Sequence, residues 1–242
     1  KSMMLHSELL RADAEYHRVR RGECGGVMFW MFSDIWPSGT WSIVDYYLVP
    51  KACYYSSKRV FEPISPIITK VKNQTSLFVV NDTLNDVAGA LTVRYIDTFG
   101  NVYEEKSQEV TAKALTSNCV IPLDDIICEN SERILVATFE YAKKSVKTFY
   151  YPDLWKNAVF ENPKLDVKIN RQSESSATVT IKAENAFARA VNIVVPDFSS
   201  TYISDNFFDM EKGETRTVEI KAKDAFTYSD ITVKTWLDEW DR

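Results

Sequence analysis

Apolar residues recur at intervals of three and four near the start of the chain. They are Leu5, Leu9, Ala12, Tyr16 and Val19. This spacing places them on one face of a helix, so a helix is predicted over residues 5–21, with Gly22 as its stop. A second helix is predicted over residues 50–59, because proline is favoured in the first turn.

Between these helices, residues 27–32 form an apolar run without clean alternation. Such a run is typical of a parallel strand that is covered on both faces. Helix, strand, loop and helix together indicate one and a half units of a β/α barrel. This piece cannot close a barrel alone, because its strand needs parallel neighbours at both edges.

The pattern changes after residue 62, where short strand-like runs alternate with polar turns. Leu91, Val93 and Tyr95 alternate with polar residues, which is the signature of a half-exposed sheet. Seven strands are predicted, a number and spacing typical of an immunoglobulin-like sandwich. They cover residues 66–72, 76–81, 89–97, 102–111, 118–122, 133–141 and 147–151.

A second set of alternating runs follows a predicted junction at residues 151–153 and predicts another sandwich. Its runs cover residues 165–169, 177–181, 190–195, 217–220 and 231–234. The predicted fold class is therefore mainly β: an incomplete C-terminal end of a (β/α)8 barrel followed by two immunoglobulin-like β-sandwich domains. The expected boundaries are 1–61, 62–153 and 154–242.

Composition and charge narrow the function. A net charge of −5 opposes nucleic-acid binding, and Arg18, Arg20 and Arg21 are interpreted as the solvated end of the first helix. No run of about twenty apolar residues is present, so no membrane partner is predicted. No group of Cys, His or Asp has metal-ligand spacing, and neither a metal nor a cofactor is expected. Because the chain opens on Lys1 instead of Met, we expect it to be part of a longer polypeptide.

The four cysteines have neither a paired spacing nor the density of a disulfide scaffold. They are interpreted as buried or free thiols. A bridge between Cys119 and Cys128 stays open for an oxidising compartment.

Tryptophan and aspartate are concentrated just after the predicted barrel strand. Three Trp and two Asp lie within the sixteen residues 30–45. Indole faces stack on the C–H faces of pyranose rings and carboxylates hold hydroxyl groups, so this stretch predicts a sugar site.

The same stretch resembles the last barrel strand of glycoside hydrolase family 2, above all its β-mannosidase branch. The residues in step with that branch are Trp30, Asp34, Trp36, Pro37, Trp41, Ser42, Asp45, Tyr46, Tyr47, Pro50, Lys51, Tyr54 and Tyr55. Met31 and Ser33 depart from its usual Gln and Asn. Residues 204–209, Ser-Asp-Asn-Phe-Phe-Asp, followed by Gly213-Glu214, resemble the terminal sandwich of β-mannosidases.

The resemblance implies an exo-acting retaining β-glycosidase that hydrolyses terminal non-reducing β-D-mannose residues. Such enzymes need two carboxyl groups about 5 Å apart, and the family carries both as glutamates that would precede Lys1. The glutamates before the predicted strand are Glu8, Glu15 and Glu23, and the helical pattern places Glu8 and Glu15 toward solvent. The chain alone is therefore predicted to be inactive. Its implied partners are a β-linked glycan and the N-terminal remainder of the same polypeptide.

Four residues are the candidate site. The resemblance places Trp30 on the floor of the subsite for the terminal sugar, with a core plug as the alternative. Asp34 is interpreted as a hydroxyl acceptor or as a partner of a catalytic group, with loop capping as the alternative. Trp36 and Trp41 are expected to support the loop.

Two alternatives stay open. One is a related exo-β-glucosaminidase or β-galactosidase of the same family. The other is a noncatalytic carbohydrate-binding or scaffold module made of the sandwiches, whose only tryptophans are Trp155, Trp236 and Trp240. The last two are close to the C-terminal end, and one or both are expected to dock onto a neighbouring domain.

Overall fold

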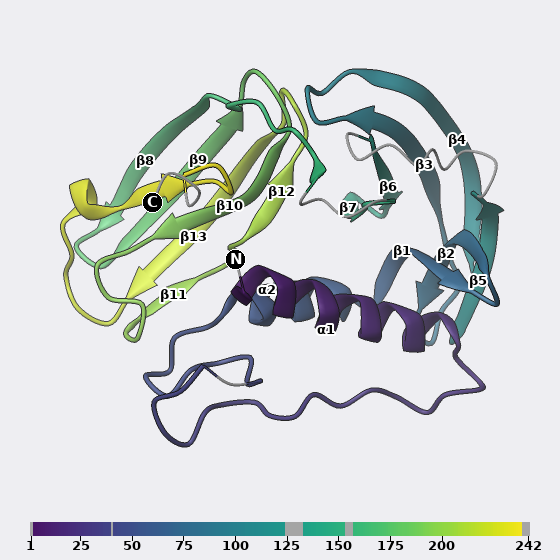
Figure 1. The fold of residues 1–242 in the computed structure, drawn as a ribbon, viewed down its shortest axis with the longest axis horizontal. Coiled ribbons are helices and arrows are strands. Elements are labelled where there is room, and N and C mark those ends of the chain that lie inside the picture. Colours follow the sequence, from purple (N-terminus) through teal and green to yellow (C-terminus); the bar gives the residue numbers. More distant parts are fainter. Residues whose placement is uncertain (1, 40, 124–132, 153–156, 239–242) are drawn as a thin grey trace. The chain divides into compact units, whose positions relative to one another are not determined.

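The computed structural model describes residues 2–39, 41–123, 133–152 and 157–238. They separate into two compact units (Figure 1). One unit consists of Leu9–Met28 and Ser57–Val159. The other consists of Lys1–Glu8, Phe29–Ser56 and Phe160–Arg242. Each unit holds one β-sandwich and part of the helices α1 (Ser2–Val19) and α2 (Ala52–Val60).

The first sandwich consists of seven described strands in two antiparallel sheets, ordered β1-β2-β5 and β4-β3-β6-β7. All seven strands predicted from the sequence are confirmed, six of them with shifted ends. The strands are β1 (Ile64–Val71), β2 (Gln74–Asn81), β3 (Val87–Asp97), β4 (Val102–Ala112), β5 (Thr116–Pro122), β6 (Arg133–Tyr141) and β7 (Lys144–Tyr150).

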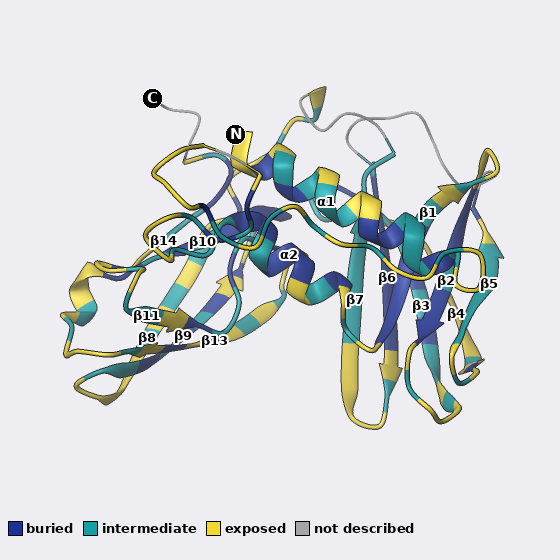
Figure 2. Ribbon diagram, turned by 90° about the horizontal axis from the view of Figure 1, so that it is seen from below, coloured by how far each residue is buried: buried dark blue, intermediate teal, exposed yellow. Residues whose placement is uncertain are grey.

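Alternating apolar residues of both sheets fill the core between them. Leu91 of β3 and Leu135 and Phe139 of β6 are fully buried there, and Figure 2 shows most of β6 in dark blue. Gly89 of β3 packs against β6 so closely that an added Cβ would lie 2.9 Å from the Phe139 ring. Glycine is therefore required where these strands meet.

The second sandwich has the sheets β12-β10-β14 and β11-β13-β9-β8. Five of its strands match predicted runs, whereas β11 and β12, of three residues each, were not predicted. The strands are β8 (Leu165–Ser173), β9 (Ser176–Ala183), β10 (Ala188–Val194), β11 (Thr201–Ile203), β12 (Phe208–Met210), β13 (Thr215–Ala222) and β14 (Thr232–Lys234).

The Ser-Asp-Asn-Phe-Phe-Asp motif joins β11 to β12 and completes this sandwich. The side-chain amide of Asn206 is fully buried, accepts a bond from the Ile193 amide at 2.8 Å and donates to the Ile193 carbonyl at 3.0 Å. It thus takes the place of a neighbouring strand. Phe208 enters the core, and Arg216 pairs with Asp205.

The C-terminal part of α1 packs on the first sandwich, where Val19 contacts Ile67 and Val80. The helix ends before Gly22, whose φ of +94° is the left-handed conformation expected after a helix. The interpretation of the arginine cluster as solvated is wrong for Arg18. Its side chain is only 7% exposed and binds Asp82 at 2.7 Å, because the helix end lies against β2 and this carboxylate directly follows that strand.

The predicted strand over residues 27–32 is wrong. These residues belong to no sheet, and Figure 1 draws them as a plain coil between α1 and α2. The nearest ladder contact is an isolated parallel bridge between Ser33 and Val44. A parallel strand requires neighbours at both edges, and the sandwiches are antiparallel sheets that offer none. A barrel remnant is therefore not seen in this structure.

No helix in the described parts of the chain is long and apolar enough to cross a membrane. Among the described cysteines, Cys24, Cys53 and Cys119 are free thiols. Cys128, and with it the open bridge to Cys119, lies outside the described residues.

The buried core predicts unequal effects for two leucines of the first unit. Leu135→Ala removes a fully buried side chain and should lower the free energy of unfolding by about 2–5 kcal/mol. Leu84→Ala removes a leucine that is 80% exposed, so its effect should stay within about 0.5 kcal/mol. Urea unfolding of both variants measures the difference, and equal losses would contradict this core.

Candidate functional site

The candidate site is the segment of residues 29–39 and 41–51, called the aromatic loop below. It presents an unusual number of large apolar side chains to solvent. These side chains are 46–75% exposed and belong to Trp30, Phe32, Ile35, Trp36, Trp41, Tyr46, Tyr47 and Leu48. A patch this rich in aromatic residues is typical of a binding or packing surface.

The two halves of the aromatic loop are joined by main-chain hydrogen bonds. The Ile43 amide donates to the Met31 carbonyl at 3.2 Å, and the Val44 amide donates to the Phe32 carbonyl at 2.9 Å. Asp45 closes the turn that follows, since its carboxylate accepts bonds from the amides of Tyr47 and Val49. The loop therefore has a defined backbone although it belongs to no sheet.

A buried ion pair fastens the base of the aromatic loop. The Lys51 ammonium donates to the Asp34 carboxylate at 2.8 Å and to the Ser42 hydroxyl at 2.6 Å. The Asp34 side chain is only 1% exposed and that of Lys51 is 14% exposed. A desolvated charge is stable only when it is paired, so each partner depends on the other.

Two titratable groups surround this pair. Burial, and then the positive charge of Lys51, lower the pKa of His6, which is therefore mainly neutral at pH 7. Burial raises the pKa of the Cys53 thiol to about 11, so it stays protonated and donates to the Ser42 carbonyl at 3.7 Å. Neither group therefore adds a charge next to the ion pair.

The structure places the four predicted site residues in two environments. Trp30 is 75% exposed, Trp36 is 59% exposed and Trp41 is 69% exposed, whereas Asp34 is turned inward. The peptide bond after Trp30 is cis. The indole faces are thus available for contact, and the carboxylate is held in the loop base.

Sequence reasoning missed the role of Lys51. It was noted only as part of the shared motif, although it is the first basic residue after Arg21. A lone cation within an aromatic and acidic stretch is a usable signal for an internal ion pair.

The glutamates that precede the loop lie differently from expectation. The prediction that Glu8 and Glu15 face solvent is wrong. Glu15 is 6% exposed and binds Arg11 at 2.9 Å, and Glu8 binds Arg189 at 2.7 Å. Arginine partners bind both, because the helix packs on another face than the predicted one: Met4, Ser7 and Ala14 are buried, whereas Leu5 and Leu9 are 56% and 61% exposed.

The tryptophans of the sandwiches offer no exposed stacking face within the described residues. Trp236 is 6% exposed, while Trp155 and Trp240 lie outside the described part of the chain. Trp236 is buried beside Phe160 and Arg189 of the same sandwich, and docking of a tryptophan onto a neighbouring domain stays a prediction. Among the tryptophans that the structure describes, the exposed indoles are therefore those of the aromatic loop.

Both sandwiches match known family models. Residues 73–157 match the Mannosidase Ig/CBM-like domain, and residues 160–238 match the Ig-fold domain of mannosidases.

Curated relatives include β-mannosidase B of Aspergillus clavatus, 26% identical over 82% of this chain and 25% of its own length. Another is β-mannosidase B of Thermothelomyces thermophilus, 28% identical over 85% of this chain and 27% of its own length. The chain thus spans about a quarter of the length of these relatives.

Solved structures share the fold. The β-D-mannosidase from Dictyoglomus thermophilum matches with a TM-score of 0.82 at 20% identity, over 97% of this chain and 29% of that one. The exo-chitosanase of Amycolatopsis orientalis matches with a TM-score of 0.73 at 18% identity, over 97% of this chain and 33% of that one. The domain models, the relatives and the fold agree with the motifs of the aromatic loop and of residues 204–209. The chain is a β-mannosidase-like part of glycoside hydrolase family 2, equivalent to the C-terminal part of such enzymes.

Proposed function

We propose that this chain is part of an exo-acting retaining β-glycosidase that hydrolyses terminal non-reducing β-D-mannose residues. The observation that carries the proposal is the aromatic loop, where a motif of the β-mannosidase branch presents exposed indoles on a fixed base. The curated relatives named β-mannosidase B favour mannose over other sugars. The substrate would be a β-linked oligosaccharide or glycan.

We assign the domains as residues 1–61, 62–153 and 154–242. In this assignment, residues 1–61 complete a (β/α)8 barrel whose other strands come from an N-terminal remainder of the polypeptide. The exposed Phe32, Ile35 and Leu48 support it, because side chains of this kind pack against neighbouring barrel elements. The two sandwiches then serve as scaffold.

Within the loop, Trp30 is proposed to contact the terminal sugar. Its exposed indole offers a π face that favours the positive charge developing on the ring. Asp34 is proposed to be a partner of a catalytic group, with its carboxylate fixed by Lys51. Trp36 and Trp41 are proposed to support the loop once the barrel covers it.

This chain alone is proposed to be inactive. Retaining hydrolysis needs two carboxyl groups about 5 Å apart. Glu8, Glu15 and Glu23 instead bind the arginines Arg189, Arg11 and Arg20.

A panel of nitrophenyl β-glycosides tests the proposal with this chain and with the longer protein assayed side by side. The longer protein should cleave the mannoside fastest, and the chain should cleave none. Faster cleavage of the glucosaminide or the galactoside would agree with the family assignment and contradict mannose as the preferred sugar. Turnover by the chain alone would overturn its proposed inactivity, and no cleavage by the longer protein would favour a carbohydrate-binding module.

The same assay tests Trp30 directly. Trp30→Ala in the longer protein should lower kcat/KM for the preferred glycoside by about 10- to 100-fold, because the lost contact is strongest in the charged transition state. Tyr202→Ala removes an aromatic residue that is 51% exposed on the second sandwich and should leave kcat/KM unchanged. Equal effects would remove Trp30 from the sugar site.

The ion pair at the loop base predicts that the loss of Lys51 alone costs more stability than the loss of both charges together. Lys51→Met leaves the buried Asp34 carboxylate without its cation and should lower the free energy of unfolding by about 3–5 kcal/mol. Adding Asp34→Asn removes the stranded charge and should restore much of the loss. Urea unfolding of the single and double variants measures the coupling.

A matched pair serves as the control for this prediction. Lys113 binds Asp86 at 2.7 Å, close to the 2.8 Å of the Lys51–Asp34 pair. Its side chain is 61% exposed and that of Asp86 is 48% exposed. Lys113→Met should change the free energy of unfolding by less than about 1 kcal/mol. A Lys51→Met effect no larger than this would show that the loop base does not depend on the pair.

A further inference from the structure

The second sandwich holds one arginine in a nearly water-free place. The Arg189 side chain is 3% exposed. Its guanidinium pairs with the carboxylate of Asp209 and, through its other terminal nitrogen, with that of Glu8 at 2.7 Å. Glu8 belongs to α1 and Asp209 to β12, so one guanidinium connects the helix to the sandwich.

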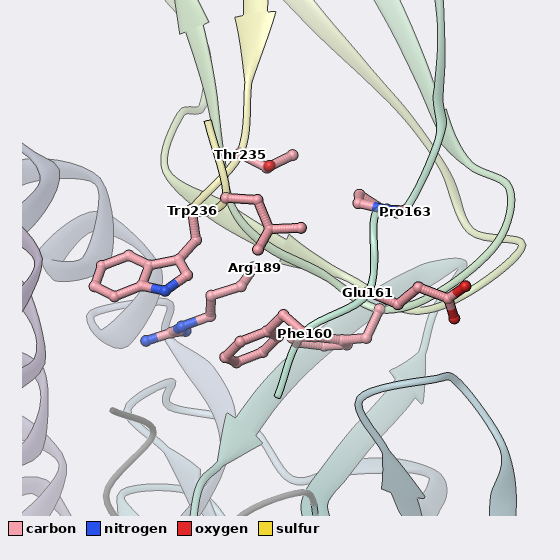
Figure 3. Close-up of a pocket in the computed structure, with 8 residues that line it drawn as sticks. Phe160, Glu161, Pro163, Arg189, Thr235 and Trp236 are labelled. Atoms are coloured by element: carbon pink, nitrogen blue, oxygen red, sulfur yellow. The ribbon is translucent and has the colours of Figure 1, made fainter. Parts of the chain in front are cut away.

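The surroundings of Arg189 fix its position. It lines a small pocket with Phe160 and Trp236, and the two rings flank the guanidinium in Figure 3. The Trp236 amide also donates to the Arg189 carbonyl at 2.9 Å. Asp209 accepts a second bond, from the Ala190 amide at 2.8 Å. A buried guanidinium with two carboxylate partners in fixed places has little freedom to move.

The same motif that supplies Asp209 also reaches α2. The rings of Phe207 and Tyr55 have centroids 6.1 Å apart, and Tyr55 is 2% exposed. The preceding residue, Asn206, is locked to Ile193 by two hydrogen bonds. Phe207 is thus a second fixed contact between the sandwich and a helix.

The two helices contact each other, and α2 contacts the aromatic loop. The Ser7 hydroxyl of α1 donates to the Ser56 hydroxyl of α2 at 2.9 Å. Cys53, one turn before Ser56, donates to the Ser42 carbonyl of the loop, and Lys51 precedes the helix directly. A continuous set of contacts therefore runs from the sandwich through α1 and α2 to the loop base.

From these contacts we propose that Arg189 is a positioning residue: through Glu8 and Asp209 it fixes the helices that hold the aromatic loop, with Phe207 as a second contact. The expected loss of catalysis in Arg189 variants rests on the proposed function. The expected loosening of the contact between α2 and the aromatic loop does not. The sandwich then has a role beyond scaffold, because it sets the place from which Trp30 reaches a sugar.

Thiol labelling of Cys53 tests the structural part in this chain. Cys53 is fully buried between α2 and the loop, so a thiol reagent reaches it only when this contact opens. With the other cysteines replaced by serine, Arg189→Met should speed labelling by about tenfold or more. Arg189→Lys should restore part of the protection, and Glu8→Gln, which leaves the sandwich pair intact, should also speed labelling.

Arg216→Met is the matched control. Arg216 pairs with Asp205 in the same sandwich and is 31% exposed, and this pair does not include α1 or α2. It should leave Cys53 labelling unchanged. Unchanged labelling in Arg189→Met and Glu8→Gln, or equal acceleration in Arg216→Met, would overturn the proposal.

The activity part uses the longer protein. Arg189→Met should raise KM for the preferred glycoside, and kcat/KM should fall by about 10- to 100-fold, as misplacement of a substrate-contacting group does. Arg189→Lys should recover part of the loss, and Arg216→Met should change neither value. A longer protein that cleaves no glycoside would defeat the proposed function only, because the Cys53 labelling decides the positioning role independently.

Discussion

Main-chain amides and carbonyls in an apolar stretch need hydrogen-bond partners, because an unpaired group away from water is costly. In the aromatic loop, Met31 and Phe32 find theirs in Ile43 and Val44 of the same loop. The Lys51–Asp34 pair closes the base below them. The loop thus keeps a defined shape outside any sheet, and its indoles stay at the surface. The proposed barrel packing, the proposed sugar contact of Trp30 and the positioning role of Arg189 all depend on this arrangement.

Much of the fold could be predicted from the sequence, because antiparallel sandwiches carry their pattern locally. Leu91, Val93 and Tyr95 alternate with polar residues, and β3 forms where they do. The strands β11 and β12 could not be predicted, since three residues hold too little periodicity to detect. Residues 27–32 have the composition of a buried parallel strand, but a strand forms only when neighbours pair with it.

The location of the exposed aromatic segment could be predicted from the sequence, whereas the orientation of its carboxylates could not. The density of Trp and Asp pointed to residues 30–45, and the indoles there are exposed. The inward turn of Asp34 could not be foreseen, because it depends on Lys51, which follows it by seventeen residues and approaches only in three dimensions. The prediction that Glu8 faces solvent failed for the same reason. Its partner Arg189 lies 181 residues away in the chain, and no local pattern encodes such a contact.

The most direct test of the account is hydrogen exchange in residues 29–39 and 41–48, measured in this chain and in the longer protein. Strands β3 and β6 serve as the internal reference, since their protection should be the same in both. If an N-terminal remainder supplies the missing barrel neighbours, exchange in the loop should slow by about a hundredfold or more in the longer protein. Equal exchange in both would contradict the barrel assignment and the sugar site that rests on it.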